Sequence, residues 1–100
     1  MLSYVNGMRE GEQTSYYENG KIKDVGSFKH DMATGEWKFY FNSGQLKARG
    51  IYARGRGEGE WQEFHENGPL KASGNYKDGK KVDEWKYYKK NGELDKILSS

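Results

Sequence analysis

The segment GEWKFYFNSGQLKARG, residues 35–50, decides the fold, because it recurs as GEWQEFHENGPLKASG at residues 59–74. Both copies begin with Gly-Glu-Trp, continue through a short stretch containing aromatic residues, turn at a glycine and resume at a leucine. The copies start 24 residues apart. Repetition with a fixed period in this range predicts an array of equivalent structural units, each too small to bury its apolar face alone.

The same period extends through almost the whole chain. The turn glycines are Gly20, Gly44, Gly68 and Gly92, and the tryptophans are Trp37, Trp61 and Trp85. Further columns with the same step begin at Tyr4, Glu12, Tyr16 and Ile22. The sequence therefore predicts a single repeat domain over residues 1–100. Its units are expected at approximately 4–27, 28–51, 52–75 and 76–99.

The composition predicts a thin fold with a small core. Hydrophobic residues make up 33% of the chain and the mean hydropathy is −1.17, values that approach those of disordered chains. Aromatic residues reach 15%, however, and disordered chains are poor in them. The net charge is only +2, from 17 basic and 15 acidic residues, whereas a dedicated nucleic-acid binder is usually more basic.

The chain has no cysteine, which excludes disulfides and thiolate chemistry. No apolar run approaches the roughly 18 residues that a membrane-spanning helix requires. The first residues, MLSYVNGMREGE, lack the apolar core of a signal peptide. We therefore expect a cytoplasmic protein.

The local sequence indicates strands rather than helices. Glycine is frequent, and the aromatic segments EWKFYF, EWQEF and EWKYY are short and each followed by a turn. The turns ENG, NSG, ENG and KNG close one hairpin per repeat, and NG, RG and DG pairs connect successive hairpins. We predict an all-β fold: a single-layer antiparallel β-meander of about eight strands in four 24-residue hairpins. The sheet should be elongated, twisted and open.

The hairpin register depends on the length of the turn. A two-residue Asn-Gly-type loop would place Phe41 opposite Leu46, whereas a three-residue loop with a left-handed glycine places Tyr40 opposite Leu46. We favour the three-residue loop, because Ser43 is poorly suited to the positive φ that a type I′ turn requires.

The favoured register also predicts which residues share a face. Tyr40 and Leu46 would lie together with three residues of the second strand, namely Ala48, Gly50 and Tyr52. The tryptophans would lie on the opposite face unless a bulge intervenes. Bulges or close aromatic packing are expected at Gly26, Gly50 and Gly74.

The repeat pattern resembles a known family. Gly-Glu-Trp, an aromatic residue, Asn-Gly-x-Leu, Gly-x-Tyr and x-x-Gly, recurring from Tyr4 to Leu94, are similar to the bacterial variant of the MORN repeat. Arrays of this variant are often assigned to antitoxins of the YwqK type. The resemblance implies an elongated antiparallel β-array used for protein scaffolding and homodimerisation, with membrane-lipid binding also proposed.

Nothing in the sequence predicts a catalytic residue, a metal site or a cofactor. The recurring glutamates, which begin at Glu12, are evenly spaced, whereas glycosidase chemistry needs one pair of carboxylates at a defined separation. We expect them to pair with Lys or Arg across strands, or to form a hydrogen bond into the adjacent turn. His30 and His65 occupy different places in the repeat without ligand spacing, which predicts exposed surface positions. The segment GRGEG at 55–59 lacks the helix and the Gly-Lys-Ser/Thr of a phosphate loop.

The binding candidates are aromatic and basic. The tryptophans are expected to form the packing ladder between repeats, or in part to line an exposed groove, because interfaces favour Trp and Tyr. The candidate partner-binding residues are Trp37, Tyr40, Trp61, Phe64, Trp85, Tyr88, Lys47 and Arg49. The basic residues of the second strands form either a solvated face or a stripe for an acidic partner or anionic headgroups.

The predicted function is a non-catalytic, protein-binding repeat scaffold. The resemblance adds an antitoxin or immunity-like role with a toxin as the partner. The alternatives are a membrane-surface module that binds anionic lipid and a structural unit that assembles into homo-oligomers through its sheet edges. Single-stranded nucleic acid is the weakest option because the charge is nearly balanced.

Overall fold

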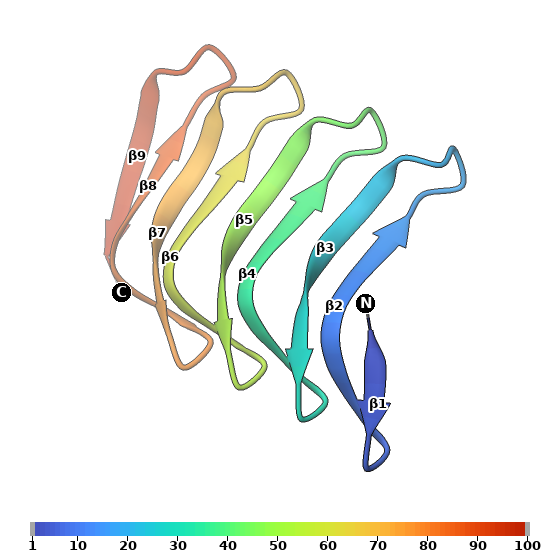
Figure 1. The fold of residues 1–100 in the computed structure, drawn as a ribbon. Coiled ribbons are helices and arrows are strands. Elements are labelled where there is room, and N and C mark those ends of the chain that lie inside the picture. The colour runs from blue at the N-terminus through green and yellow to red at the C-terminus, as the bar shows by residue number, and fades with distance from the viewer. Residues whose placement is uncertain (1, 100) are drawn as a thin grey trace.

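The computed structural model describes residues 2–99 as one nine-stranded antiparallel sheet, with no helix among them (Figure 1). The strands lie side by side in the order of the sequence. They are β1 (Ser3–Val5), β2 (Met8–Tyr16), β3 (Ile22–Lys29), β4 (Met32–Tyr40), β5 (Leu46–Ala53), β6 (Arg56–Phe64), β7 (Leu70–Lys77), β8 (Lys80–Tyr88) and β9 (Leu94–Ser99). The predicted meander is confirmed, with the three-residue β1 in addition to the eight strands expected.

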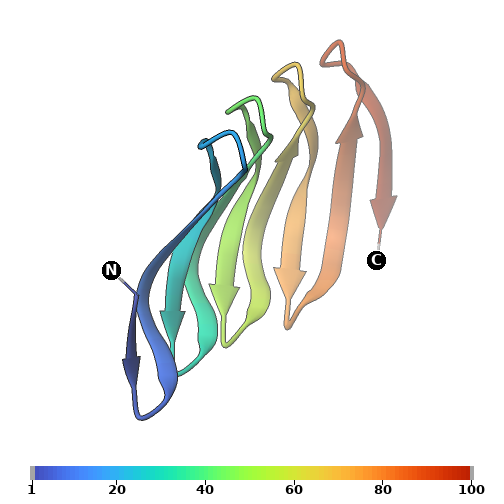
Figure 2. The same ribbon diagram turned by 90° about the vertical axis from the view of Figure 1, so that its right-hand side faces the viewer.

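The sheet is a single curved layer (Figure 2). Its extents are 47 × 34 × 13 Å, so the curved sheet is much thinner than it is long or wide. A structure of this thickness has little interior to fill, which explains the low hydrophobic fraction of the chain.

The turns at the upper edge of the sheet in Figure 1 close the hairpins. In the second of these upper turns, the Phe41 N–H donates to the Gln45 carbonyl at 2.8 Å, and the Gly44 N–H donates to the Phe41 carbonyl at 2.9 Å. Gly44 has a φ of +96°, and Tyr40 lies opposite Leu46. The predicted three-residue loop with a left-handed glycine is therefore confirmed.

The turns at the lower edge are two-residue connections between successive hairpins. Both residues of each turn have positive φ, as type I′ turns require. In the second lower turn, His30 and Asp31 have φ values of 51° and 66°. Asp31 stands where the other lower turns have glycine, and aspartate is among the residues that tolerate this conformation best.

A β-bulge near each upper turn changes the predicted faces. Phe39 lies opposite Ala48, whereas the next residue, Tyr40, lies opposite Leu46. Lys47 is therefore an extra residue in β5, and the bulge shifts the register by one position. Equivalent shifts occur in the first, third and fourth hairpins.

As the prediction allowed, the tryptophans share a face with the glycine column because of this bulge. Beyond it, Trp37 pairs with Gly50, and the aromatic ring of Tyr52 packs against Trp37 on the same face. Ala48 shares this face as the partner of Phe39. Because successive residues alternate between faces, Tyr40 and its partner lie on the other side.

Each tryptophan packs onto a glycine of the preceding repeat. A Cβ atom placed on Gly50 would stand 1.9 Å from a ring carbon of Trp61, so only glycine leaves room for the indole. The Trp61 indole N–H donates to the Ile51 carbonyl at 3.0 Å. The same arrangement joins Trp37 to Gly26 and Ser27, and Trp85 to Gly74 and Asn75. The predicted close aromatic packing at these glycines is confirmed.

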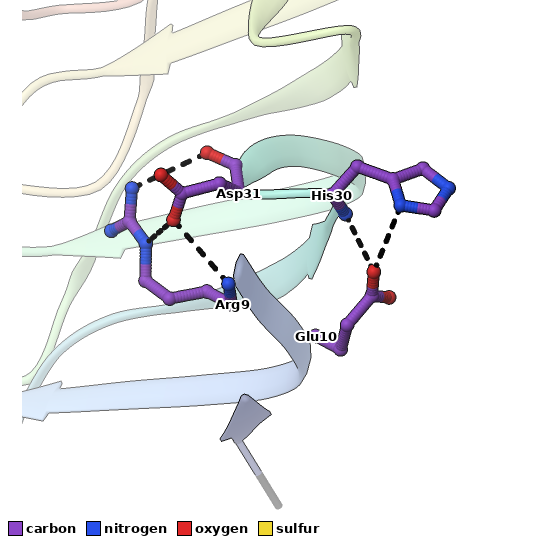
Figure 3. Close-up of polar contacts among 4 residues, drawn as sticks. All are labelled: Arg9, Glu10, His30 and Asp31. Atoms are coloured by element: carbon purple, nitrogen blue, oxygen red, sulfur yellow. Dashed lines mark hydrogen bonds and ion pairs between the residues drawn. The ribbon is translucent and has the colours of Figure 1, made fainter. Parts of the chain in front are cut away.

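Side-chain bonds join the turns of the first and second repeats. At the lower edge, Arg9 forms an ion pair with Asp31, and Glu10 accepts a hydrogen bond from the His30 N–H at 2.8 Å (Figure 3). The His30 ring is exposed, as predicted, with Nδ1 3.2 Å from the Glu10 carboxylate. At the upper edge, the Tyr17 hydroxyl donates to a backbone carbonyl of the next repeat at 2.6 Å.

The third and fourth repeats are joined in the same way. His65 Nε2 donates to the Tyr88 carbonyl at 2.7 Å, and the Asp78 N–H donates to Glu58 at 2.9 Å. His65 is half-buried by this contact, so the prediction of an exposed surface histidine is wrong at this position. The sequence did not show the contact, because it depends on how neighbouring turns stack.

Candidate binding face

The tryptophans and the aromatic residues that pack on them form one continuous surface, which we call the aromatic face. It consists of Phe28, Trp37, Phe39, Tyr52, Trp61, Tyr76, Trp85 and Tyr87. Tyr52 lies between Trp37 and Trp61, with ring centroids 5.9 and 5.0 Å away, and both contacts are edge-to-face. Tyr76 repeats this arrangement between Trp61 and Trp85 at 5.7 and 5.1 Å. The result is a ladder of rings that runs across the sheet from β3 to β8.

The rings of this ladder differ in exposure. The tryptophans are buried, with exposed fractions of 6%, 9% and 1% for Trp37, Trp61 and Trp85. The tyrosines and Phe39 are only partly buried, and no second layer of the described chain covers them. A partner on this face would therefore touch mainly tyrosine and phenylalanine, with the indoles as a rigid support.

The structure does not bring the predicted binding residues together on one surface. Trp37, Trp61 and Trp85 lie buried in the aromatic face. Alternation places Tyr40, Phe64 and Tyr88 on the opposite face, half-buried near the upper turns. Lys47 is exposed in the β5 bulge, and Arg49 is exposed beside Gln62, to which it donates a hydrogen bond at 2.8 Å. A binding role of these residues stays a prediction.

Sequence reasoning missed the more accessible aromatic residues as site candidates. Tyr52 and Tyr76 stand in a visible column of the repeat, so periodicity could have pointed to them. Phe39 and Tyr87 share a column with Ser15 and Glu63, which hides them from any search for a recurring residue.

Cations lie over several rings of the aromatic face. The Arg9 guanidinium is 4.0 Å from the centroid of Phe28. Lys81 Nζ is 4.7 Å from the Trp85 ring and donates to the Tyr87 hydroxyl at 3.2 Å. This hydrogen bond raises the pKa of Lys81 above its ordinary value of 10.5. The rings thus already bind cations from their own chain.

Neutral and acidic groups complete the chemistry of the face. Burial, with a smaller effect of the neighbouring Tyr76, raises the pKa of Tyr52, which keeps its hydroxyl protonated. Glu63 pairs with Ala72 on this face, and Asp24 pairs with Phe39. One Asp24 carboxylate oxygen is buried without a hydrogen-bond partner among the described residues. The face therefore offers rings, cations and acceptors within a short distance of each other.

The opposite face carries both acidic and basic side chains. Glu36 lies 4.0 Å from Lys38 of its own strand, so this pair differs from the cross-strand pairing predicted for the repeated glutamates. Within residues 2–99, no group of three His, Asp or Glu side chains could hold a metal ion. The same residues contain no helix of the length and apolarity needed to cross a bilayer.

An open sheet built from one recurring hairpin, with a glycine-supported aromatic ladder on one face, defines a β-repeat array. Three segments of the chain match the family model of the MORN repeat variant, at residues 9–30, 33–53 and 57–78. They cover more than half of the sequence, and the chain belongs to this family. Each matched segment spans one hairpin, namely β2–β3, β4–β5 or β6–β7. No curated protein matches the chain.

Proposed function

We propose that this protein is a non-catalytic scaffold that binds another protein on its aromatic face. The observation that carries the proposal is the row of half-buried rings that no second layer covers. Aromatic residues on a rigid support are the residues that most often dominate protein interfaces, because they bury a large area at a small entropic cost.

The polar groups of the face favour a peptide chain over a lipid surface. Arg9 and Lys81 provide cations, whereas Asp24 and Glu63 provide carboxylates. A protein segment can satisfy both signs, but the carboxylates would repel anionic headgroups. A catalytic role has no support from the histidines, because His65 bonds to a neighbouring turn.

The resemblance to antitoxins of the YwqK type adds a finer proposal. The partner would be a toxin, and the protein would block it by covering its active surface. Family resemblance alone supports this identity of the partner. Purifying the bound protein and measuring whether it arrests growth when expressed without the scaffold tests the proposal. A harmless partner would refute the antitoxin role and leave the scaffold role intact.

Affinity capture with matched variants tests the scaffold role. The double variant Phe39→Ser and Tyr87→Ser clears two rings from the aromatic face and copies the residue that the first repeat has in this column. The control, Ile51→Ser and Ile97→Ser, removes two exposed apolar side chains from the opposite face. We expect a stoichiometric partner from the source cell to be lost with the first variant and retained with the control. Equal retention by two folded variants would refute binding on the aromatic face.

A membrane-surface role is the second candidate, and one observation favours it. Lys23, Lys47 and Lys71 recur in the first three repeats near the upper edge and form a basic row, which ends at Asp95 in the fourth. Exposed Glu18 and Glu66 in the adjoining turns weaken its positive potential. Flotation with vesicles containing phosphatidylserine tests this role: salt-sensitive binding that a Lys47→Glu variant reduces would support it, whereas no binding at low salt would refute it.

Self-assembly through the sheet edges is the third candidate. β9 is exposed along its entire length and pairs only with β8 among the described strands. An unpaired edge of this kind can accept a strand from a second copy. Light scattering over a hundredfold range of concentration tests the idea, and a constant monomer mass would refute it.

A further inference from the structure

One column of the repeat places a different side chain in each unit at the same point of the aromatic face. Its members are Arg9, Ala33, Gly57 and Lys81, at successive steps of 24 residues. Two of them are cations and both lie over aromatic rings, whereas the third repeat has no side chain at all. In two of the four repeats, a cation therefore occupies the place that Gly57 leaves open.

The two cations define the geometry of the occupied place. Arg9 on β2 extends over Phe28 of the following strand, with its guanidinium carbon 4.0 Å from the ring centroid. Lys81 on β8 lies over Trp85 of its own strand at 4.7 Å. The place at Gly57 is flanked by the equivalents of both rings, because Tyr76 corresponds to Phe28 and Trp61 corresponds to Trp85.

The surroundings of Gly57 confirm that this place lies between the two rings. A Cβ atom on Gly57 would stand 3.2 Å from Cγ of Tyr76 and 3.4 Å from the Trp61 indole nitrogen. A cavity of about 330 Å³ opens here, and Tyr52 forms its third aromatic wall. The remaining lining residues are Gly55, Arg56 and Gly79. We call this cavity the Gly57 slot.

The glycines keep the Gly57 slot open, and Arg56 forms part of its rim. Because side chains alternate along β6, Arg56 projects toward the face opposite to that of Gly57. Its Cβ and Cγ atoms lie 3.6 and 3.8 Å from the position of a Cβ on Gly79. Among the described residues, no cation lies over the rings of Tyr52, Trp61 or Tyr76, in contrast to the cations that Arg9 and Lys81 place over Phe28 and Trp85.

We propose that the Gly57 slot binds a guanidinium or ammonium group of the partner, such as an arginine or lysine side chain. The inference rests on the proposed function, since it assumes that a protein binds on the aromatic face. Its chemical basis is the negative face of aromatic rings, which attracts cations within about 6 Å. The partner would supply in the third repeat the cation that the chain itself supplies in the first and fourth.

Small probes test the slot without knowledge of the partner. N-acetyl-arginine methylamide represents a side-chain cation, and choline represents a free quaternary ammonium. Their neutral analogues are N-acetyl-citrulline methylamide and 3,3-dimethylbutan-1-ol. We expect both cations to shift the Trp61 indole and Gly57 amide NMR signals at millimolar concentration, and the neutral analogues to bind at least fivefold more weakly. Equal binding of the neutral analogues would overturn the proposal.

Substitutions at Gly57 provide the matched variants. Gly57→Arg places an internal cation in the slot, as Arg9 does in the first repeat, and should weaken probe binding at least tenfold. Gly57→Ala adds only the methyl group that Ala33 has, and should change binding less than threefold. If Gly57→Arg does not fold, Tyr76→Leu, which removes one ring, should weaken binding of the cations to a similar extent. Unchanged binding in a folded Gly57→Arg or Tyr76→Leu variant would overturn the slot.

The slot and the scaffold role can fail separately. If a captured partner stays bound to Gly57→Arg but is lost with the Phe39 and Tyr87 variant, the partner uses the aromatic face without the slot, and the inference is wrong. If the probes bind as expected and no partner depends on the aromatic face, the slot exists but the scaffold role is wrong. Comparing the two cations separates a preference for a side chain from a preference for a free ammonium compound.

Discussion

The junction between the second and third repeats differs from the junctions on either side of it. Repeats one and two are joined by side chains at both edges of the sheet, including Glu10 to the lower turn and Tyr17 to the upper turn. Repeats three and four are joined likewise by Glu58 and His65. Among the described residues, no side-chain hydrogen bond joins the turns of repeats two and three at either edge.

Substitutions at three positions account for this difference. Thr34 occupies the column of Glu10 and Glu58, and its side chain makes no bond to the next lower turn. Phe41 stands where the first and third upper turns have Tyr17 and His65, so no polar atom can reach the neighbouring carbonyl.

The third substitution is Ser43, in the column of Asn19 and Asn67. Asn19 donates to the Asn42 carbonyl of the next upper turn at 2.8 Å, and Asn67 donates to the Lys90 carbonyl at 3.1 Å. The Ser43 hydroxyl is too short for this contact and instead accepts from the Gln45 N–H of its own turn.

Aromatic contact replaces the missing turn bonds at this junction. Phe39 stacks on Trp61 of the next repeat, with centroids 6.4 Å apart and planes inclined by 27°. It also stacks on Trp37 of its own strand. The corresponding residues at the outer junctions, Ser15 and Glu63, have no ring to contribute. One hairpin can therefore be joined to the next either by directional bonds at the turns or by ring packing on the face.

Trp61→Ala should have the largest effect on the junction between repeats two and three. Truncation of a buried tryptophan costs about 3–5 kcal/mol, and this one also removes the partner of Phe39. We expect urea unfolding to split into two transitions, because no side-chain hydrogen bonds between the described turns support the backbone pairing of repeats two and three. Trp37→Ala is the control: it should cost a similar free energy but retain one transition. Circular dichroism monitors the unfolding. A single transition in both variants would show that the junctions are equivalent.

Ser43→Asn should reduce the difference by supplying the missing amide. The new side chain can donate to the carbonyl of residue 66, as Asn19 and Asn67 do in their turns. A net hydrogen bond contributes about 0.5–1.5 kcal/mol, and exposure of the turn favours the lower end. Asn67→Ser, which removes such a bond, should lower the free energy of unfolding by the same amount. Changes of the same sign in the two variants would contradict this account.

The smallest effect is the pH dependence of the first junction. Hydrogen bonds from Arg9 hold the pKa of Asp31 below its ordinary value of 3.8. A carboxyl whose folded pKa is lowered stabilises the fold above the unfolded pKa, and this contribution disappears as the pH falls through the folded pKa. Arg9→Gln should therefore raise the Asp31 pKa in an NMR titration. Its destabilisation relative to the wild type should decline as the pH falls from 3.8 through the lowered folded pKa of Asp31, and should shrink in high salt. A constant difference would exclude this pair.

The sequence predicted the parts of the fold that depend on local chemistry. The 24-residue period gave the strand order, and the unsuitability of Ser43 for a type I′ turn gave the Tyr40–Leu46 register. The bulge at Lys47 could not be predicted, because one extra residue leaves no mark on the composition of a strand and yet reverses every face beyond it.

The candidate site was less predictable for a related reason. The recurring Trp61 column indicated the aromatic ladder. The tryptophans are buried, however, and the more accessible rings belong to residues such as Phe39, whose column varies. The side-chain hydrogen bonds between turns link residues 20 to 23 positions apart, so they form only when the hairpins lie side by side in the sheet.

The seating of each indole on the glycine of the preceding repeat gives the array a simple means of growth. A duplicated block of 24 residues, wherever its boundaries fall, brings one tryptophan and one glycine with it. The inserted tryptophan packs on the glycine of the preceding repeat, and the tryptophan of the following repeat packs on the inserted glycine. Length can therefore change by whole copies during evolution without new core residues, and each copy can then diverge at its turns and on its open face.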